Sequence, residues 1–210
     1  MYVQTNLFQI DWKDPQTDRA QDIAGFPVNG TANAADARTR GFELQTRYRF
    51  LSNWTVRYNT AYTLGEFVDT VRNCLYVNNS TRECRTWGKG GKLGGGPKWK
   101  HNASLRFNTT LDGGTYLWAS LSGRYVGPVP VTRTDSDVQQ QRFRPAYVMS
   151  NLNMGAGLGA WDINLYVQNL ANKREIVSEQ VTGTGVGDLS GARVIFTTPR
   201  TIGATVTYSF

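Results

Sequence analysis

About eight segments of this 210-residue chain alternate apolar and polar side chains with a period of two. The last segment, residues 199–210, shows the pattern most plainly: Ile202, Val206 and Phe210 share one face, and threonine and serine occupy the other. Such a period predicts β-strands with one face in an apolar environment and one in a polar environment. Comparable alternation recurs in residues 7–13, 42–50, 53–64, 98–108 and 161–169, and weaker alternation in residues 116–126 and 147–157. The chain is therefore expected to be all-β.

The links between these segments are alternately short and long. The short links are residues 51–53, 111–114 and 158–160, and the long links are residues 15–37, 66–97, 127–145 and 173–199. Antiparallel strands joined in this way place all short turns at one end of the sheet and all long loops at the other. Transmembrane β-barrels have this layout, with short periplasmic turns, long extracellular loops and strands that are apolar outside and polar inside. We therefore expect an antiparallel up-and-down transmembrane β-barrel, with a soluble sandwich or jelly roll as the alternative.

Charge and aromatic content agree with a barrel. The formal net charge of +7 favours anionic partners, but the basic residues are scattered along the chain, so no nucleic-acid partner is expected. Several aromatic residues lie beside the short links, where the interfacial girdle of a membrane barrel belongs. They are Phe50, Trp54, Phe107, Tyr116, Trp161, Tyr208 and Phe210. Outer-membrane lipid is therefore an expected partner.

The sequence gives little support for catalysis, metal binding or cofactor binding. The single histidine, His101, falls on the outward face of its strand beside Trp99, which indicates an interfacial ring rather than a catalytic base. One histidine and two cysteines are too few for a convincing tetrahedral metal site. The glycine-rich residues 88–96 lack the phosphate-loop spacing, because neither Lys89 nor Lys92 precedes serine or threonine. We expect no enzymatic activity and no cofactor.

The two cysteines, Cys74 and Cys84, lie in the same long link. An oxidising compartment favours their pairing as a disulfide. Closure of so short a loop is worth roughly 3 kcal/mol in the chain-entropy description. The alternative is a pair of unpaired thiols in the loop.

Several stretches resemble the C-terminal barrel of TonB-dependent outer-membrane receptors. FQIDWKDPQ at 8–16 is similar to a strand of that family with the pattern Phe-x-x-x-Trp-x-Asp-x-Gln, and RGFELQTRYRF at 40–50 resembles its Gly-x-Glu strand. PKW at 97–99 resembles its Pro-x-Trp opening, and VQNLANKREI at 167–176 resembles its Asn-Leu-x-Asp-Lys segment, with Asn172 in place of the aspartate. The stretches follow the family's order and span essentially the whole chain.

The resemblance implies a barrel of about 22 strands with a plugged lumen, of which this chain is the last sector. The plug domain, the TonB-contacting segment and the signal peptide are then expected to lie outside residues 1–210. It also implies TonB-energised uptake of a scarce solute, such as a siderophore, cobalamin or an oligosaccharide, across the bacterial outer membrane. Candidate ligand contacts in the long loops are Tyr76, Trp87, Lys89, Lys92 and Arg133. The alternative is a free-standing eight-strand barrel with an adhesin or structural role, and an outer-membrane hydrolase is disfavoured by the single histidine.

The end of the chain resembles the C-terminal signal that the barrel-assembly machinery reads in bacterial outer-membrane proteins. The residues that carry this resemblance are Gly203, Val206, Tyr208 and Phe210. The assembly machinery is therefore an expected partner, and an ordinary last strand of a soluble sheet is the alternative.

The charges assigned to the inward faces favour a sector of a large barrel. The inward cations are Lys13, Arg47, Arg49, Arg57, Lys100, Arg106 and Arg124, and the inward acids are Asp11, Glu43 and Asp162. An eight-strand barrel has an interior only wide enough for side chains, so several of these charges would be desolvated and unpaired. We therefore expect an open curved sheet whose first and last strands do not pair with each other.

Overall fold

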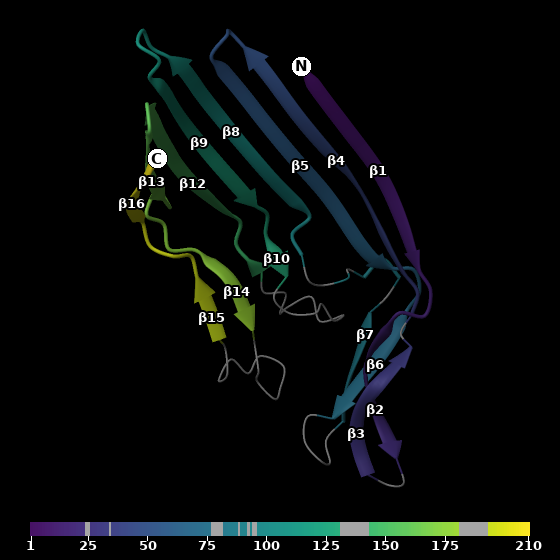
Figure 1. Cartoon of the computed structure of the whole chain (residues 1–210). Helices are drawn as coiled ribbons and strands as arrows, with labels where there is room; N and C mark the ends of the chain where they lie inside the picture. Colours follow the sequence, from purple (N-terminus) through teal and green to yellow (C-terminus); the bar gives the residue numbers. More distant parts are fainter. Residues whose placement is uncertain are drawn as a thin grey trace.

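The computed structural model is built on one antiparallel sheet of eight strands. It describes residues 1–23, 26–33, 35–76, 82–87, 89–91, 93, 96–130, 143–180 and 193–210. In their order across the sheet, the strands are β1 (Tyr2–Trp12), β4 (Ala37–Phe50), β5 (Trp54–Phe67), β8 (Trp99–Thr110), β9 (Tyr116–Val126), β12 (Tyr147–Leu158), β13 (Trp161–Gln168) and β16 (Thr201–Tyr208). Figure 1 shows one curved sheet, and within the described residues no ladder joins β1 to β16. The sheet is open, as expected.

The four long links contain short hairpins that the sequence pattern did not reveal. These are β2 (Gln16–Ile23) with β3 (Phe26–Asn33), β6 (Val71–Tyr76) with β7 (Arg82–Trp87), β10 (Val129–Pro130) with β11 (Phe143–Arg144), and β14 (Ile176–Gln180) with β15 (Arg193–Phe196). All four hairpins extend from the same end of the sheet, opposite the short turns (Figure 1). The expected alternation of short and long connections is therefore present, but the long connections are partly structured.

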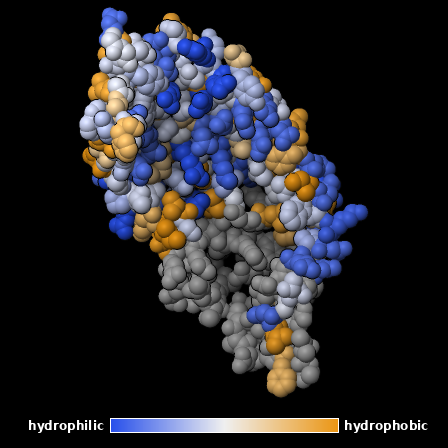
Figure 2. Space-filling model, viewed as in Figure 1, coloured by the Kyte–Doolittle hydropathy of each residue, from blue (hydrophilic) through white to orange (hydrophobic). Residues whose placement is uncertain are grey.

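The register divides the sheet into two faces, because residues directly opposite each other on neighbouring strands share a face. One complete row on the apolar face consists of Tyr48, Val56, Leu105, Leu121, Leu152, Val167 and Ile202. The polar face carries amide, hydroxyl and charged side chains, and Figure 2 shows hydrophilic residues gathered over the middle of the sheet. No helix in the described part of the chain is long and apolar enough to cross a membrane.

Strand β1 has the opposite phase from the one expected. Asp11 lies opposite Arg38 on the apolar face, whereas Phe8 lies opposite Gly41 on the polar face. The assignment of Asp11 to the inward face is therefore wrong, and Lys13 follows the end of β1. Gly41 supplies the physical reason, because the Phe8 ring occupies its missing side-chain position: a Cβ there would lie 2.8 Å from Phe8 Cζ.

Aromatic residues form a cluster at each end of the apolar face. At the short-turn end, ring centroids are 6.2 Å apart for Phe50–Trp54, 4.9 Å for Trp54–Phe107 and 4.8 Å for Trp161–Tyr208. Tyr116 does not belong to this girdle, since its partners Thr110 and Gly157 place it on the polar face.

A second cluster, which sequence reasoning missed, lies at the loop end of β4, β5 and β8. Its centroid distances are 6.1 Å for Phe42–Tyr62, 5.6 Å for Phe42–Trp99 and 4.8 Å for Tyr62–Trp99. Along β4, Phe42 and Phe50 are about 27 Å apart at the usual strand rise, or roughly 20 Å along the normal of a tilted barrel. This spacing is close to the height of a membrane barrel's apolar band, about 25 Å.

Candidate functional site

The polar face of the sheet has an excess of cations. Its charged residues are Arg47, Arg49, Arg57, Lys100, Arg106 and Arg124 against Glu43 and Asp162. The ion pairs found among the described residues, Arg38–Asp11 and Arg40–Glu66, include none of these side chains. Arg47 even lies directly opposite Arg57, an arrangement that costs free energy unless an anion or water separates the charges.

Two of these cations contact other residues of the sheet and its turns. Arg49 Nε donates a hydrogen bond to the Ser52 carbonyl at 2.9 Å and so fastens the first short turn. The Arg106 guanidinium lies 5.0 Å from the Trp118 ring centroid in a cation–π contact.

The remaining four cations are free to meet a partner. Arg47, Arg57, Lys100 and Arg124 are exposed and have no hydrogen bond or ion pair to another side chain in the described part of the chain. An amide row composed of Gln45, Asn59 and Asn102 leads across the sheet to Arg124, which lies directly opposite Asn102. This surface therefore has the chemistry to bind a hydrated or anionic group rather than an apolar one.

A pocket of about 230 Å³ lies at the loop end of β5. Its lining consists of Thr63, Leu64, Gly65, Leu93, Gly96, Lys98, Trp99, Pro128 and Phe143. The segment before β8 reaches it by pairing along β5: Leu93 N donates to the Gly65 carbonyl, and Thr63 N donates to the Lys98 carbonyl, both at 2.9 Å. Aromatic and aliphatic walls beside one ammonium group suit the apolar part of an anionic solute.

One predicted ligand contact, Lys89, is not part of the described lining of this pocket. Tyr76 and Trp87 stand at opposite ends of the β6–β7 hairpin, where they pair with Arg82 and Val71. Lys89 is exposed in a turn. Lys92 and Arg133 lie outside the described residues. Their role as contacts stays a prediction.

The β6–β7 register also bears on the cysteines. Cys74 lies directly opposite Cys84. Cys74 is 5 % exposed and is disulfide-bonded. Facing positions on two paired strands agree with the geometry that the expected disulfide requires.

Asn169 organises the base of the last long connection. It is 1 % exposed, and its Nδ2 donates to the carbonyls of Lys173 and Thr198 at 2.8 and 2.9 Å. Its Oδ1 accepts from Lys173 N at 3.0 Å, and its own N–H donates to Asn151 Oδ1 at 3.0 Å. The Asn169 side chain thus ties the end of β13 to the approach to β16, and its backbone N–H links the same point to β12 through Asn151.

His101 lies on the apolar face, as expected. Its ring stacks on Trp99 at 5.4 Å, and its Nδ1 is 2.9 Å from Tyr58 Oη and 2.7 Å from Thr60 Oγ1. Among the residues that the structure describes, no group of three or more His, Cys, Asp or Glu side chains could hold a metal ion. The described residues thus form a sheet with one basic polar face and a pocket at its loop end.

Residues 1–170 match the family described as TonB dependent receptor-like, beta-barrel. The match covers most of the chain, and the chain belongs to this family of receptor barrels. The family places it in the bacterial outer membrane, and it is a family of receptors rather than enzymes. No curated protein sequence matches the chain.

Three solved structures share the fold. The ferric-catecholate import receptor Fiu from E. coli K12 is 18 % identical with a TM-score of 0.66, and the match covers 99 % of this chain and 25 % of Fiu. The siderophore receptor PiuA from Acinetobacter baumannii is 15 % identical with a TM-score of 0.68, covering 98 % and 26 %. The ferric yersiniabactin uptake receptor FyuA from Yersinia pestis is 17 % identical with a TM-score of 0.52, covering 99 % and 35 %. The chain thus spans a quarter to a third of the length of these receptors.

Proposed function

We propose that this chain forms the C-terminal sector of the barrel of a TonB-dependent receptor that takes up a scarce solute of the siderophore class. The observation that carries the proposal is the eight-stranded sheet itself, whose one face is apolar between two aromatic clusters and whose other face is polar and basic. The names of the three receptors described above are those of a ferric-catecholate import receptor, a siderophore receptor and a ferric yersiniabactin uptake receptor. A plug domain inside the barrel, moved by TonB, completes the proposed receptor.

The distribution of charge supports an anionic solute. Lys98 lines the pocket at the loop end of β5. The polar face of the sheet, which we propose faces the lumen, carries Arg47, Arg57, Lys100 and Arg124, and these cations have no ion-pair partners among the described residues. Cations along a polar wall raise the local concentration of an anion and speed its encounter with the site. A ferric complex is anionic when the negative charges of its deprotonated oxygen ligands outnumber the three positive charges of the iron, as in a tris-catecholate.

The free-standing eight-strand barrel finds no support in the strand order. Closure would require a ladder between β1 and β16, and these strands are the two ends of the described sheet. An adhesin or structural role therefore has no specific observation in its favour.

Uptake measured in a strain that lacks the native receptor tests the proposal. We expect the plasmid-borne receptor to restore accumulation of a ferric siderophore in a tonB-positive background and not in a tonB-negative one. Equal accumulation with and without the receptor gene, for catecholate, hydroxamate and phenolate siderophores alike, would refute it.

Two matched variants refine this experiment. Lys98→Gln should weaken solute binding about tenfold, as loss of one charge-assisted contact in a pocket does. Lys13→Gln changes the same charge beyond the end of β1, outside the lining of that pocket, and should leave binding unchanged.

A further inference from the structure

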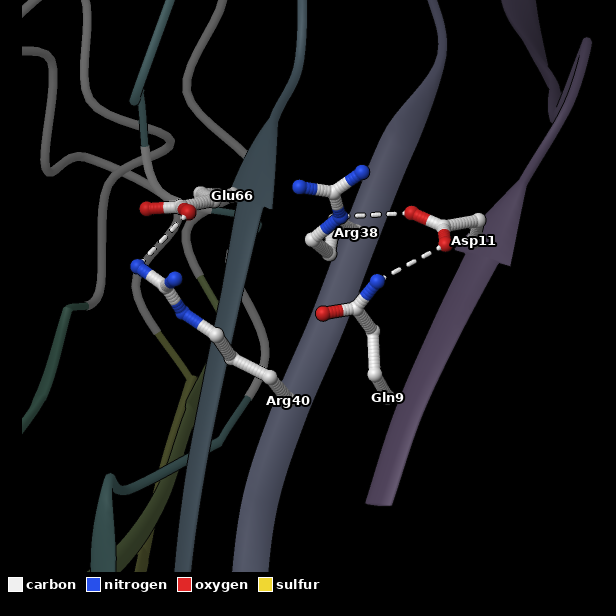
Figure 3. A network of polar contacts seen from close by, with 5 residues as sticks. All are labelled: Gln9, Asp11, Arg38, Arg40 and Glu66. Carbon is white, nitrogen blue, oxygen red and sulfur yellow. Dashed lines mark hydrogen bonds and ion pairs between the residues drawn. The ribbon is translucent and has the colours of Figure 1, made fainter.

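Four charged residues on the apolar face lie together at the loop end of β1, β4 and β5. Asp11, Arg38, Arg40 and Glu66 are the only Asp, Glu, Lys or Arg side chains that the register places on that face of the eight-stranded sheet. Figure 3 shows them with Gln9 as one polar network. Charged side chains on the lipid face of a barrel are strongly unfavourable at the bilayer centre and tolerated near its interfaces. This charged patch therefore lies outside the hydrocarbon.

The height of the patch follows from the loop-end aromatic cluster. Arg40 and Arg38 lie two and four residues before Phe42 in β4, which places them about 7 and 14 Å along the strand toward its loop end. In a tilted barrel these distances are roughly 5 and 10 Å along the membrane normal. The headgroup layer of a bilayer is roughly 5–8 Å thick on each side. The two guanidinium groups thus stand at the level of lipid headgroups.

The carboxylates orient both guanidinium groups and leave donors unused. Arg38 Nε binds Asp11 Oδ1 at 2.5 Å, and Gln9 Nε2 donates to Asp11 Oδ2 at 3.0 Å. Arg40 Nη2 lies 3.1 Å from Glu66 Oε1. The other N–H groups of both arginines have no partner among the described residues, and in Figure 3 the dashed line from Asp11 ends on Arg38 Nε and on neither terminal nitrogen.

An open cavity of about 570 Å³ adjoins Arg40. Its lining consists of Leu7, Phe8, Gln9, Arg40, Gly41, Tyr62 and Leu64. Most of these residues belong to the apolar face, and Leu7, Tyr62 and Leu64 give it hydrocarbon and aromatic walls. The cavity thus offers an apolar surface directly beside free guanidinium donors.

We propose that this patch binds a phosphate-bearing lipid of the outer leaflet. The phosphate accepts hydrogen bonds from the unused N–H groups of Arg38 and Arg40, which match its oxygens in geometry and charge. An acyl chain of the same lipid lies along Leu7, Tyr62 and Leu64. The carboxylates of Asp11 and Glu66 hold the guanidinium groups in place from their other edges. The site is separate from the proposed solute path, because it lies on the opposite face of the sheet.

Native mass spectrometry of the detergent-purified protein, with lipid A as the probe, tests the proposal. We expect wild-type protein to retain diphosphorylated lipid A, and the R38Q/R40Q variant to bind it at least tenfold more weakly. The matched variant R47Q/R57Q removes the same charge from the polar face and should bind lipid A like wild type. R38K/R40K keeps the charge but not the planar guanidinium donors, and it should bind lipid A more weakly than wild type and more tightly than R38Q/R40Q.

Two further measurements keep the test decisive if R38Q/R40Q fails to assemble. Leu7→Gln leaves both ion pairs intact at a side chain that is 81 % exposed, and it should also weaken lipid A binding. Inorganic phosphate should not displace the lipid. Unchanged binding in either R38Q/R40Q or Leu7→Gln, or full displacement by inorganic phosphate, would overturn the proposal.

Discussion

Aromatic rings of the polar face cover glycines on neighbouring strands. A Cβ at Gly203 would lie 2.3 Å from Tyr166 Cζ, and a Cβ at Gly155 would lie 2.7 Å from Trp118 Nε1. Contacts this short force a ring or a strand to move. Gly203, which belongs to the predicted assembly signal, therefore has a packing role, because only glycine leaves room for the Tyr166 ring.

Gly155→Ala should destabilise the protein by about 1–3 kcal/mol, since the new methyl group meets Trp118 and the Ile163 carbonyl, both at 2.7 Å. Gly123→Ala is the matched control, because its Cβ would meet nothing nearer than the Met149 carbonyl at 4.0 Å. Thermal or urea unfolding in detergent measures both. Equal stability of the two variants would show that the ring does not need the glycine.

The two cysteines lie on the paired strands β6 and β7. Cys74 and Cys84 are expected to be linked, because they face each other across the β6–β7 ladder. Peptide mapping of non-reduced protein by mass spectrometry should show one cross-linked peptide, and reduction should lower stability by roughly 3 kcal/mol. Free thiols in protein from oxidised outer membranes would contradict the pairing.

At the scale of elements, Asn169 and Asn172 end β13 and position β16. Both residues have positive φ angles, 50° and 51°, which asparagine tolerates better than most residues. Asn172 Oδ1 accepts from Arg200 N at 3.0 Å, next to the Asn169 contact with Thr198. The turn after β13 is thus tied to the segment before β16, although 20 or more residues of chain separate them.

Asn169→Asp should cost about 2–4 kcal/mol, because it replaces a two-hydrogen donor with a buried oxygen that faces the carbonyls of Lys173 and Thr198. Asn172→Asp keeps the oxygen that accepts from Arg200 and should change stability by less than about 0.5 kcal/mol. Unfolding midpoints of the two variants give the comparison. A larger loss of stability in Asn172→Asp than in Asn169→Asp would contradict the structural role given to Asn169.

The terminal strand β16 and the residues after it contain the predicted assembly signal. We expect Y208S/F210S to lower the amount of receptor inserted in the outer membrane, because it removes the aromatic residues that resemble the assembly signal. T205S/T207S alters the polar face of the same strand and should insert normally. Heat-modifiable mobility on gels and quantitative immunoblots report insertion, and equal abundance of all variants would remove the signal hypothesis.

The strands were predictable because alternation of apolar and polar residues is a local signal. The alternation identified the segments of the main sheet, but it predicted the wrong face for the side chains of β1. The orientation of β1 depends on the packing of Phe8 against Gly41, which is a contact between strands and leaves no local signal in the sequence. The pocket residues Leu93 and Phe143 carried no local signal, because they meet only when separate connections fold against β5. The hairpins of the long links were missed because their strands lack a clear alternation of apolar and polar residues.

On the scale of the whole molecule, the two faces of the sheet differ in charge in the way expected if one faces lipid and the other faces water. The apolar face excludes charge except at the patch of Asp11, Arg38, Arg40 and Glu66, which lies beyond the loop-end aromatic cluster. The polar face gathers an excess of cations that a narrow eight-strand barrel would desolvate. Both observations agree with a sector of a wide, water-containing barrel.

Spin labelling along β13 tests this division most directly. A nitroxide at each position from 161 to 168, in protein reconstituted in bilayers with its cysteines oxidised, reports collision with dissolved oxygen in lipid and with a nickel chelate in water. We expect strict alternation, with oxygen contact highest at Ile163, Leu165 and Val167 and nickel contact highest at Asn164 and Tyr166. Uniform exposure to one reagent, or the reverse phase, would contradict the assignment of the two faces to lipid and lumen.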